Sequence, residues 1–327
     1  MITLQITWLL LIGILIIGYA ILDGFDLGVG IWHLFAKKGA ERGAFIRAIE
    51  PFWDGNEVWL LTAGGALFAA FPAVYATVFS GFYLALILVL VGLIFRAVAI
   101  EYRNKVADHR WVAVWDVIFA VGSILPSLLY AVAIGNLLRG LPLSAAGDYL
   151  GGFFDLLNPY ALTVGLVGLA MFAVHGALYL AIKTGGETQC KARAWAARAW
   201  WAYAACFLIA AGWTSHVYVH GSAALAQAFG AAAALAIGLI RTFNRQGRDT
   251  AAFLASCVGI ALVMLGVVAV LFPNLVIASN DPARSLTVFN ASSSERTLGV
   301  MLVIALIGMP VVIGYTAVIH RIFKGKV

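Results

Sequence analysis

The sequence predicts an all-α, polytopic membrane protein that forms a single integral-membrane domain over residues 1–327. Hydrophobic residues make up 63% of the 327-residue chain and charged residues only 11%, and the mean hydropathy is +0.97. A soluble domain is about half apolar and about a quarter charged. This chain therefore has more apolar surface than one water-soluble core could bury, and a lipid bilayer is the solvent that accommodates it.

Nine apolar segments are each near or above the ~20 residues that a helix needs to cross the hydrocarbon core. They cover residues 7–35, 52–76, 78–100, 113–137, 159–182, 198–219, 222–241, 250–272 and 298–322. An odd number of spans places the two termini on opposite sides of the membrane. The loops are short, and the longest on the outer side, 138–158 and 273–297, leave no room for a soluble domain.

The segment boundaries follow local signals. The second segment begins after Glu50-Pro51, and proline suits the first position of a helix. Only the turn around His220-Gly221 separates the sixth segment from the seventh. The alanine run 231–236 in the seventh segment predicts a face on which helices pack closely.

The basic residues set the orientation. With the N-terminus outside and the C-terminus in the cytoplasm, all but three of the 21 Lys and Arg residues lie in cytoplasmic loops or span ends. The three on the outer side are Arg139, Arg284 and Arg296. This is the positive-inside pattern. It explains the net charge of +6, so no nucleic-acid partner is needed.

Two pairs of carboxylates stand inside the apolar segments, where ionisable side chains are costly and are functional candidates by default. The stretch LDGFDLGVG places Asp23 and Asp26 on one helix face, with Asp26 roughly 14 Å inside Phe35. The stretch WDGNEVW places Asp54 and Glu57 in the same relation near the cytoplasmic mouth of the next span. An antiparallel helix pair predicts a ladder of Asp54, Glu57, Asp26 and Asp23 from the cytoplasm inward.

Two interpretations of this ladder stay open. Carboxylates in a low dielectric can exchange protons near neutral pH, so the ladder could conduct protons. Alternatively, Arg96 near the inner end of the third segment needs a counter-ion, which Glu57 or Asp26 could supply, and a fixed ion pair would serve folding. Asp54 alone would also meet the helix dipole favourably in the first turn.

Histidine and cysteine residues give no strong metal signature. His175 lies near the middle of a span, where it could ligate a haem, although a hydrogen bond to a neighbouring helix is the more common role. His216 and His220 lie four residues apart at an outer helix end with no carboxylate or cysteine nearby, which favours a solvated helix end over a metal site. The three cysteines are far apart, so neither a disulfide nor a zinc site is expected.

The glycines of GFDLGVG are like those of a phosphate-binding loop, but no strand precedes them and they lie inside a span. Gly24 and Gly28 form a GxxxG pattern, which predicts a close contact with another helix.

Four longer stretches carry a stronger signal than these short motifs. They read GYAILDGFDLGVG, PFWDGNEVWLLTAGGALFAAFP, YATVFSGFYLALILVLVGLIFRAVAIEYRNK and NASSSERTL. Together they resemble subunit II of the cytochrome bd quinol oxidases, and the resemblance runs from residue 8 to about residue 320. The loop between the sixth and seventh segments is almost absent here, so any role of that loop in the family does not carry over.

The resemblance implies a complex that oxidises membrane quinol and reduces dioxygen to water. In that family, subunit I carries two b-type haems, one d-type haem and the quinol-oxidising loop. Subunit II is a nine-helix partner, built as two four-helix bundles plus one peripheral helix, that binds no haem and has no independent catalysis. The expected setting is the bacterial inner membrane, with surrounding lipid, a small accessory subunit in some complexes, and a groove that a structural quinone or lipid could fill.

The resemblance also implies that acids of subunit II conduct cytoplasmic protons toward the haem site. Carried over residue by residue, the proton-pathway residues are Asp23, Asp26, Asp54 and Glu57, and the lining or ion-pairing residues are Trp53, Asn56 and Arg96. At the position of Glu57 the family has Glu or Gln.

Two other function classes compete with this one. A proton-coupled secondary transporter would use the same carboxylates, but transporters have broken helices in matching halves, and the glycines near residue 24 have no counterpart in the second half. A structural scaffold for the haem subunit would keep the acids locked by Arg96. Copurification with a haem-bearing chain would distinguish an oxidase subunit from a transporter. The kinetics of mutants would distinguish a proton path from a scaffold.

Overall fold

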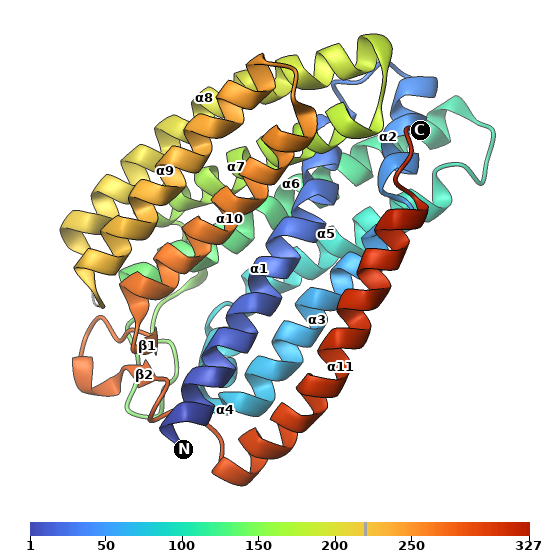
Figure 1. The fold of residues 1–327 in the computed structure, drawn as a ribbon. Coiled ribbons are helices and arrows are strands. Elements are labelled where there is room, and N and C mark those ends of the chain that lie inside the picture. The colour runs from blue at the N-terminus through green and yellow to red at the C-terminus, as the bar shows by residue number, and fades with distance from the viewer. Residues whose placement is uncertain (219–220) are drawn as a thin grey trace.

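The computed structural model describes residues 1–218 and 221–327 and is built almost entirely of helices (Figure 1). The helices are α1 (Ile2–His33), α2 (Ala40–Ile49), α3 (Trp53–Ala70), α4 (Pro72–Gly81), α5 (Tyr83–Tyr102), α6 (His109–Arg139), α7 (Pro159–Lys183), α8 (Gly186–Val217), α9 (Ala223–Arg245), α10 (Asp249–Leu271) and α11 (Glu295–Ile322). The short strands β1 (Asn274–Val276) and β2 (Leu286–Thr287) pair antiparallel, and two 3₁₀ turns cover Phe153–Leu156 and Pro282–Arg284. The expected end of the sixth span at 219 and the expected turn at His220 lie outside the described residues.

Seven of the described helices are long and apolar enough to cross a membrane: α1, α5, α6, α7, α9, α10 and α11. They match seven of the nine expected segments to within a few residues. The segment expected at 198–219 belongs to α8, a longer helix of 32 residues that begins at Gly186. In α3, Asp54, Asn56 and Glu57 occupy the first two turns and lower the mean hydropathy of a short helix.

The prediction of one continuous span over 52–76 is wrong. The chain leaves the helix at Phe71, whose φ of −134° and ψ of 67° are not helical, and α4 begins at Pro72. Proline has no N–H to donate and disfavours the helical conformation of the residue before it. The apolar run therefore divides into an 18-residue helix and a 10-residue helix.

A second difference is α2, a short helix in the segment expected to be a plain loop. Its apolar side chains Phe45, Ile46 and Ile49 are buried against the rest of the molecule. Gly39, with a φ of +85°, makes the turn into it, a conformation that glycine adopts without strain. The helix anchors one end of the molecule and positions Arg42, which is buried.

Helix α1 is central, because it packs against α3, α6 and α7. Its contact with α7 is close at Gly28, where an added Cβ would lie 2.1 Å from the carbonyl oxygen of Phe172. A Cβ on Gly24 would lie 2.8 Å from the Phe172 ring. The close helix contact predicted from the GxxxG pattern is confirmed.

The two termini lie at opposite ends of the helical body (Figure 1). Helix α2 and the C-terminus are at one end, and α4, β1 and β2 are near the N-terminus at the other (Figure 1). Helix α11 packs on α1 and α3, but Leu298 is its one buried residue. It therefore lies on the outside of this chain.

Candidate functional site

Arg96 of α5 is fully buried and binds carboxylates from two other helices. Its Nη2 donates to Asp23 Oδ1 of α1 at 2.6 Å and to Glu57 Oε1 of α3 at 2.5 Å. The Asp23 side chain is fully buried, whereas the Glu57 side chain is 21% exposed. One guanidinium therefore connects three helices, and Glu57 is the carboxylate through which this contact reaches the surface of the chain.

Asp26 lies on the same face of α1 but is held differently. Its Oδ2 accepts a hydrogen bond of 2.8 Å from Asn56 Nδ2 of α3, and Asn56 also donates to the backbone oxygen of Leu22. Asp26 is fully buried, and its Oδ1 has no hydrogen-bond partner among the described residues. Within that part of the chain, Asp26 makes no ion pair. We call Asp23, Asp26, Asn56, Glu57 and Arg96 the Arg96 cluster.

The hydrogen bonds depart from the linear order expected for the ladder. Glu57 and Asp23 bind the same nitrogen of Arg96, whereas Asp26 is attached to Asn56, one residue before Glu57 on α3. Asp26 is therefore a side branch beside the Arg96 ion pairs, and its bonds do not join Glu57 to Asp23.

Asp54 lies outside this network, in the first turn of α3. Its side chain is exposed and the neighbouring Trp53 is half-buried. None of the described residues donates a hydrogen bond to the Asp54 carboxylate. The structure thus brings together Asp23, Asp26, Asn56, Glu57 and Arg96, and it leaves Asp54 and Trp53 at the end of α3 near α2 and the C-terminus.

His175 of α7 is fully buried, and both of its ring nitrogens are hydrogen-bonded. Nε2 lies 2.9 Å from the carbonyl oxygen of Ile21, and Nδ1 lies 2.6 Å from Ser256 Oγ. Because a carbonyl only accepts, Nε2 donates a proton to the carbonyl oxygen of Ile21, and Nδ1 is occupied by the Ser256 hydroxyl, which also lies 2.7 Å from the carbonyl oxygen of Phe253. The ring also stacks on Phe253, with centroids 4.6 Å apart. Neither nitrogen is free for iron, and the side chain links α1, α7 and α10.

A second buried cluster was missed by the sequence analysis. Asp116 of α6 accepts three hydrogen bonds: His33 Nε2 and Arg103 Nε lie 2.6 Å from its Oδ1, and Arg42 Nη1 lies 2.9 Å from its Oδ2. Arg42 also donates to the backbone oxygens of Leu34 and Ala36. We call His33, Arg42, Arg103 and Asp116 the Asp116 cluster. It joins α1, α2, the end of α5 and α6.

One signal in the sequence could have pointed to this cluster. Asp116 is the one acidic residue inside the apolar segment 113–137, and an acid there needs a partner. For Arg42 and Arg103 the sequence indicates only a role in setting the topology, because positive charge in a cytoplasmic loop is sufficiently explained by orientation. Their buried role depends on tertiary contacts that the linear pattern does not contain.

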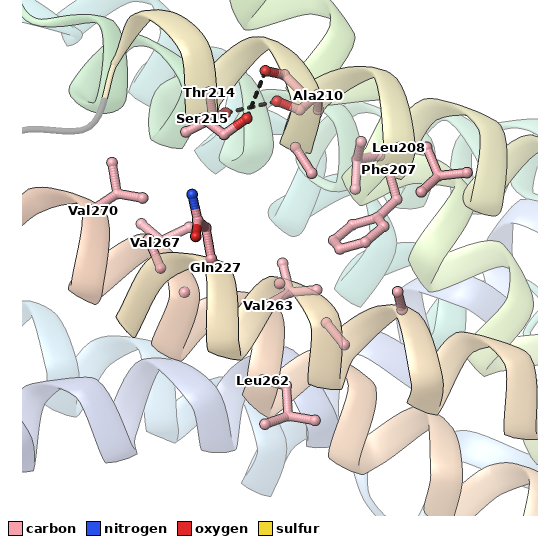
Figure 2. A pocket seen from close by; sticks show the side chains of 18 of the residues that line it. Phe207, Leu208, Ala210, Thr214, Ser215, Gln227, Leu262, Val263, Val267 and Val270 are labelled. Atoms are coloured by element: carbon pink, nitrogen blue, oxygen red, sulfur yellow. Dashed lines mark hydrogen bonds between the residues drawn. The ribbon is translucent and has the colours of Figure 1, made fainter. Parts of the chain in front are cut away.

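An apolar cleft of about 480 Å³ lies among α7, α8, α9 and α10. Figure 2 shows Phe207 and Leu208 of α8 on one side and Val263 and Val267 of α10 on the other, with Gln227 of α9 projecting into the gap. The hydroxyl groups of Thr214 and Ser215 donate back to carbonyls of their own helix (Figure 2). The cleft is therefore almost entirely hydrocarbon, and it lies in a different part of the molecule from the two charge clusters.

The family model described as cytochrome bd terminal oxidase subunit II matches residues 4–323 of this chain. The cytochrome bd-I ubiquinol oxidase subunit 2 of Escherichia coli strain K12 is 38% identical, over 96% of this chain and 92% of that protein. The cytochrome bd ubiquinol oxidase subunit 2 of Bacillus subtilis strain 168 is 35% identical, over 100% of this chain and 98% of that protein.

Among solved structures, a chain of the bd oxidase from Geobacillus thermodenitrificans is similar in fold. The TM-score is 0.81, and the similarity covers 98% of each chain at 16% sequence identity. At that identity the match supports the helical fold alone, and the functional evidence comes from the family model and the closer relatives in sequence.

Proposed function

We propose, from the premise that this chain belongs to the cytochrome bd terminal oxidase subunit II family, that it completes a membrane-bound quinol oxidase and carries protons from the cytoplasm toward the partner that reduces dioxygen. Its relatives are named as subunit 2 of ubiquinol oxidases, which implies a subunit 1 in the complex. The proposed partner holds two b-type haems and one d-type haem and oxidises the membrane quinol. This chain contributes no independent catalysis.

The observation that carries the proton path is the charge imbalance of the Arg96 cluster. Three carboxylates, Asp23, Asp26 and Glu57, accompany one guanidinium, and two of the three are fully buried. An uncompensated buried charge is strongly destabilising. The net charge of the cluster is closest to zero when some of its carboxylates are protonated. A group of acids that must hold protons is also one that can take them up and release them.

The proposed route enters at Asp54 and Glu57 and ends at Asp26 and Asp23. Asp54 is exposed at the start of α3, and Glu57 is one turn further along the same helix with 21% of its side chain exposed. Asn56 orients Asp26 by its hydrogen bond. Proton transfer from Glu57 to Asp26 would use side-chain oxygens that have no hydrogen-bond partner among the described residues, including Asp26 Oδ1.

The proposed topology has nine spans with the N-terminus outside and the C-terminus in the cytoplasm. In this proposal α3 and α8 also cross the membrane, in addition to the seven apolar helices. The nine spans form two four-helix bundles, with α11 as the peripheral helix outside them. Two observations support this arrangement: α11 is exposed along most of its length, and basic residues are concentrated in the loops at the end of the molecule where α2 lies.

For cofactors, we propose that none is bound by this chain alone except a structural quinone or lipid. The hydrogen bonds on both nitrogens of His175 support the absence of haem ligation. The apolar cleft among α7, α8, α9 and α10 has a lining suited to an isoprenoid or acyl chain.

The first experiment is affinity purification through this chain, followed by an optical spectrum. We expect a second chain and haem absorption in the complex, and no haem band on this chain alone. A stoichiometric haem on the isolated chain that His175→Ala removes would overturn this part of the proposal.

The second experiment tests the route with substitutions that keep size and hydrogen bonding but remove the titratable proton. We expect Asp54→Asn and Asp26→Asn to leave the haem-to-protein ratio unchanged while quinol-driven oxygen consumption falls. Asp108→Asn, at an exposed helix cap on the same end, is the matched control. Normal turnover in both variants would exclude the route.

A scaffold function is the second candidate, because the ion pairs of Arg96 to Asp23 and Glu57 are those expected of a structural lock. In a pure scaffold, Asp23→Asn would impair assembly, Arg96→Gln would partly restore it, and no variant would lower turnover per assembled enzyme. The two functions therefore differ in the measurement that each substitution moves.

A further inference from the structure

Helices α8 and α9 lie side by side along one flank of the molecule (Figure 1), and their ends beside Asp249 carry an unusual set of arginines. Arg241 and Arg245 are one turn apart on α9, and Arg198 is on α8. Among the described residues none of these three pairs with a carboxylate. The nearest acid along the chain, Asp249, is already bound by Arg193, which donates to both of its oxygens at 2.6 and 2.7 Å.

Two tryptophans hold Arg241 in place. Its guanidinium carbon lies 4.8 Å from the ring centroid of Trp200 and 4.5 Å from that of Trp201. The Trp200 ring is itself fixed, because its indole N–H donates to the carbonyl oxygen of Ile237 at 2.6 Å. A guanidinium stacked on aromatic rings keeps its edge of N–H donors free, and that edge matches the oxygens of a phosphate.

The position along the helix sets the depth of this group. Helix α9 has 23 residues, so it is roughly 34 Å long and just exceeds a hydrocarbon core of about 30 Å. Arg241 is four residues from its end, roughly 6 Å inside, and Trp201 beside it is 60% exposed. Tryptophan at this level is typical of the boundary between acyl chains and headgroups.

Arg241 and Arg245 also repel each other. Like charges one turn apart on a helix are destabilising, and no carboxylate in the described chain offsets this pair. An anion at the headgroup level would remove the repulsion. In the surrounding membrane, the molecule that presents an anion at that depth, with hydrocarbon directly below it, is an anionic phospholipid.

From this geometry we propose that the site formed by Trp200, Trp201, Arg241 and Arg245 binds the phosphodiester headgroup of an anionic phospholipid. Arg241, held against both indole rings, contacts the phosphate. Arg245, one turn further along α9, adds attraction to the headgroup, and the exposed face of Trp201 contacts the first part of the acyl chains. The site is separate from the proton path and does not depend on it.

The test uses the complete complex with its partner subunit. It is placed in nanodiscs of phosphatidylcholine with added phosphatidylglycerol, and native mass spectrometry counts the retained lipids. We expect the unmodified complex to retain phosphatidylglycerol in preference to phosphatidylcholine. Removing an arginine near the membrane surface should weaken this binding about fivefold, so R241Q/R245Q should nearly abolish the preference.

Two further variants make the result specific. R241K keeps the charge but loses the stacked donor edge, so we expect an intermediate loss. R110Q removes an exposed arginine from the start of α6, where no described aromatic ring stacks on its guanidinium, and it should retain phosphatidylglycerol as the unmodified complex does. If the double variant does not assemble, R245Q alone, at an exposed position, should still show the fivefold loss.

Thermal unfolding gives an independent measurement. Phosphatidylglycerol should raise the unfolding temperature of the unmodified complex and of R110Q, but not that of R241Q/R245Q, and all three should unfold alike in pure phosphatidylcholine. Equal phosphatidylglycerol retention by R241Q/R245Q and R110Q would overturn the proposal. A protein subunit found covering Trp201 in the complex, with no lipid retained, would overturn it as well.

Discussion

The Arg96 cluster and the Asp116 cluster are both buried and both charged, yet their compositions are inverted. Around Arg96, three carboxylates share one cation. Around Asp116, two arginines and a histidine share one carboxylate. The difference matters because a carboxylate can be neutralised by a proton, whereas a guanidinium stays charged in a protein.

This inversion separates two roles. A cluster with excess acid can change its charge by taking up protons, so it suits proton exchange. A cluster with excess arginine cannot adjust in that way and is held by its single anion. Asp116 also joins four elements, including α2, so we interpret the Asp116 cluster as an anchor and the Arg96 cluster as the chemically active group.

The largest expected effect is therefore at Asp116. Asp116→Asn leaves Arg42 and Arg103 buried without a counter-ion, at a cost of about 3–5 kcal/mol. We expect little assembled complex, measured as the yield of haem-containing enzyme after purification. Asp108→Asn makes the same change at an exposed N-cap on the same helix and should assemble normally. A full yield of Asp116→Asn would show that the arginines do not depend on this carboxylate.

Removing the central cation of the other cluster should cost less. Arg96→Gln leaves Asp23 and Glu57 without their partner, but these acids can take up protons, so we expect a loss near the lower end, about 3 kcal/mol. Combining it with Asp23→Asn should recover part of the assembly, because one buried acid is removed as well. Thermal unfolding of the two variants measures the coupling, and purely additive losses would contradict it.

Much of the fold followed from the sequence because a bilayer allows few solutions. Long apolar segments must be helices, so seven candidate spans were predicted to within a few residues. The GxxxG pattern that includes Gly28 predicted the close contact that α1 makes with α7. The break at Phe71-Pro72 was missed, although proline was the signal for it. The segment around α2 was missed because a ten-residue amphipathic helix depends on tertiary packing more than on its own sequence.

The candidate site was predictable to a smaller degree. Acids inside apolar segments stand out, so Asp23, Asp26 and Glu57 were found, and Arg96 was found as a cation needing a partner. Which of the two acids on α1 would pair with Arg96 was not predictable. Asp23 and Asp26 share one face of α1 and differ only in the residues of other helices that they contact. Asp116 escaped notice because its partners lie on three other elements.

A substitution at Asp26 is expected to have a moderate effect on stability, opposite in sign to the losses expected for Asp116→Asn and Arg96→Gln. Asp26→Asn removes excess negative charge from the Arg96 cluster, while the amide can still accept the hydrogen bond from Asn56 Nδ2. We expect the complex to be equally stable or more stable by about 1 kcal/mol, and its turnover to fall. Thermal unfolding measured beside oxygen consumption checks both. A clear loss of stability would mean that Asp26 is structural, as Asp116 is.

The smallest effect is expected in a third charged region, between α2 and α8, where the ion pair is partly exposed: the side chain of Lys191 is 28% exposed and that of Glu41 is 9% exposed. Glu41 accepts hydrogen bonds from the Lys37 backbone N–H at 2.6 Å, from Thr188 Oγ1 at 3.2 Å and from Lys191 Nζ at 3.2 Å. Burial raises the pKa of Glu41, but these three donors outweigh it, and the pKa lies below its ordinary value of 4.5.

A carboxylate whose pKa is lower in the folded protein stabilises the fold above the pKa of the unfolded chain, and this contribution disappears as the pH falls through the folded value. Glu41 should therefore contribute at neutral pH and lose its contribution only below pH 4.5. Water reaches the pair at Lys191, whose side chain is 28% exposed, and partly screens it, so Glu41→Gln should cost about 1 kcal/mol at pH 7.

The measurement is thermal unfolding of the purified complex at pH 7 and at acidic pH, for the unmodified chain and for Glu41→Gln. We expect the two curves to differ at pH 7 and to converge as the pH falls below 4.5. Glu50→Gln, at the exposed end of the same helix, is the control and should behave as the unmodified chain at both pH values. A Glu41→Gln deficit as large as that of Asp116→Asn would remove the distinction between partly exposed and buried pairs, since it would mean that access of water at Lys191 does not weaken the contacts of Glu41.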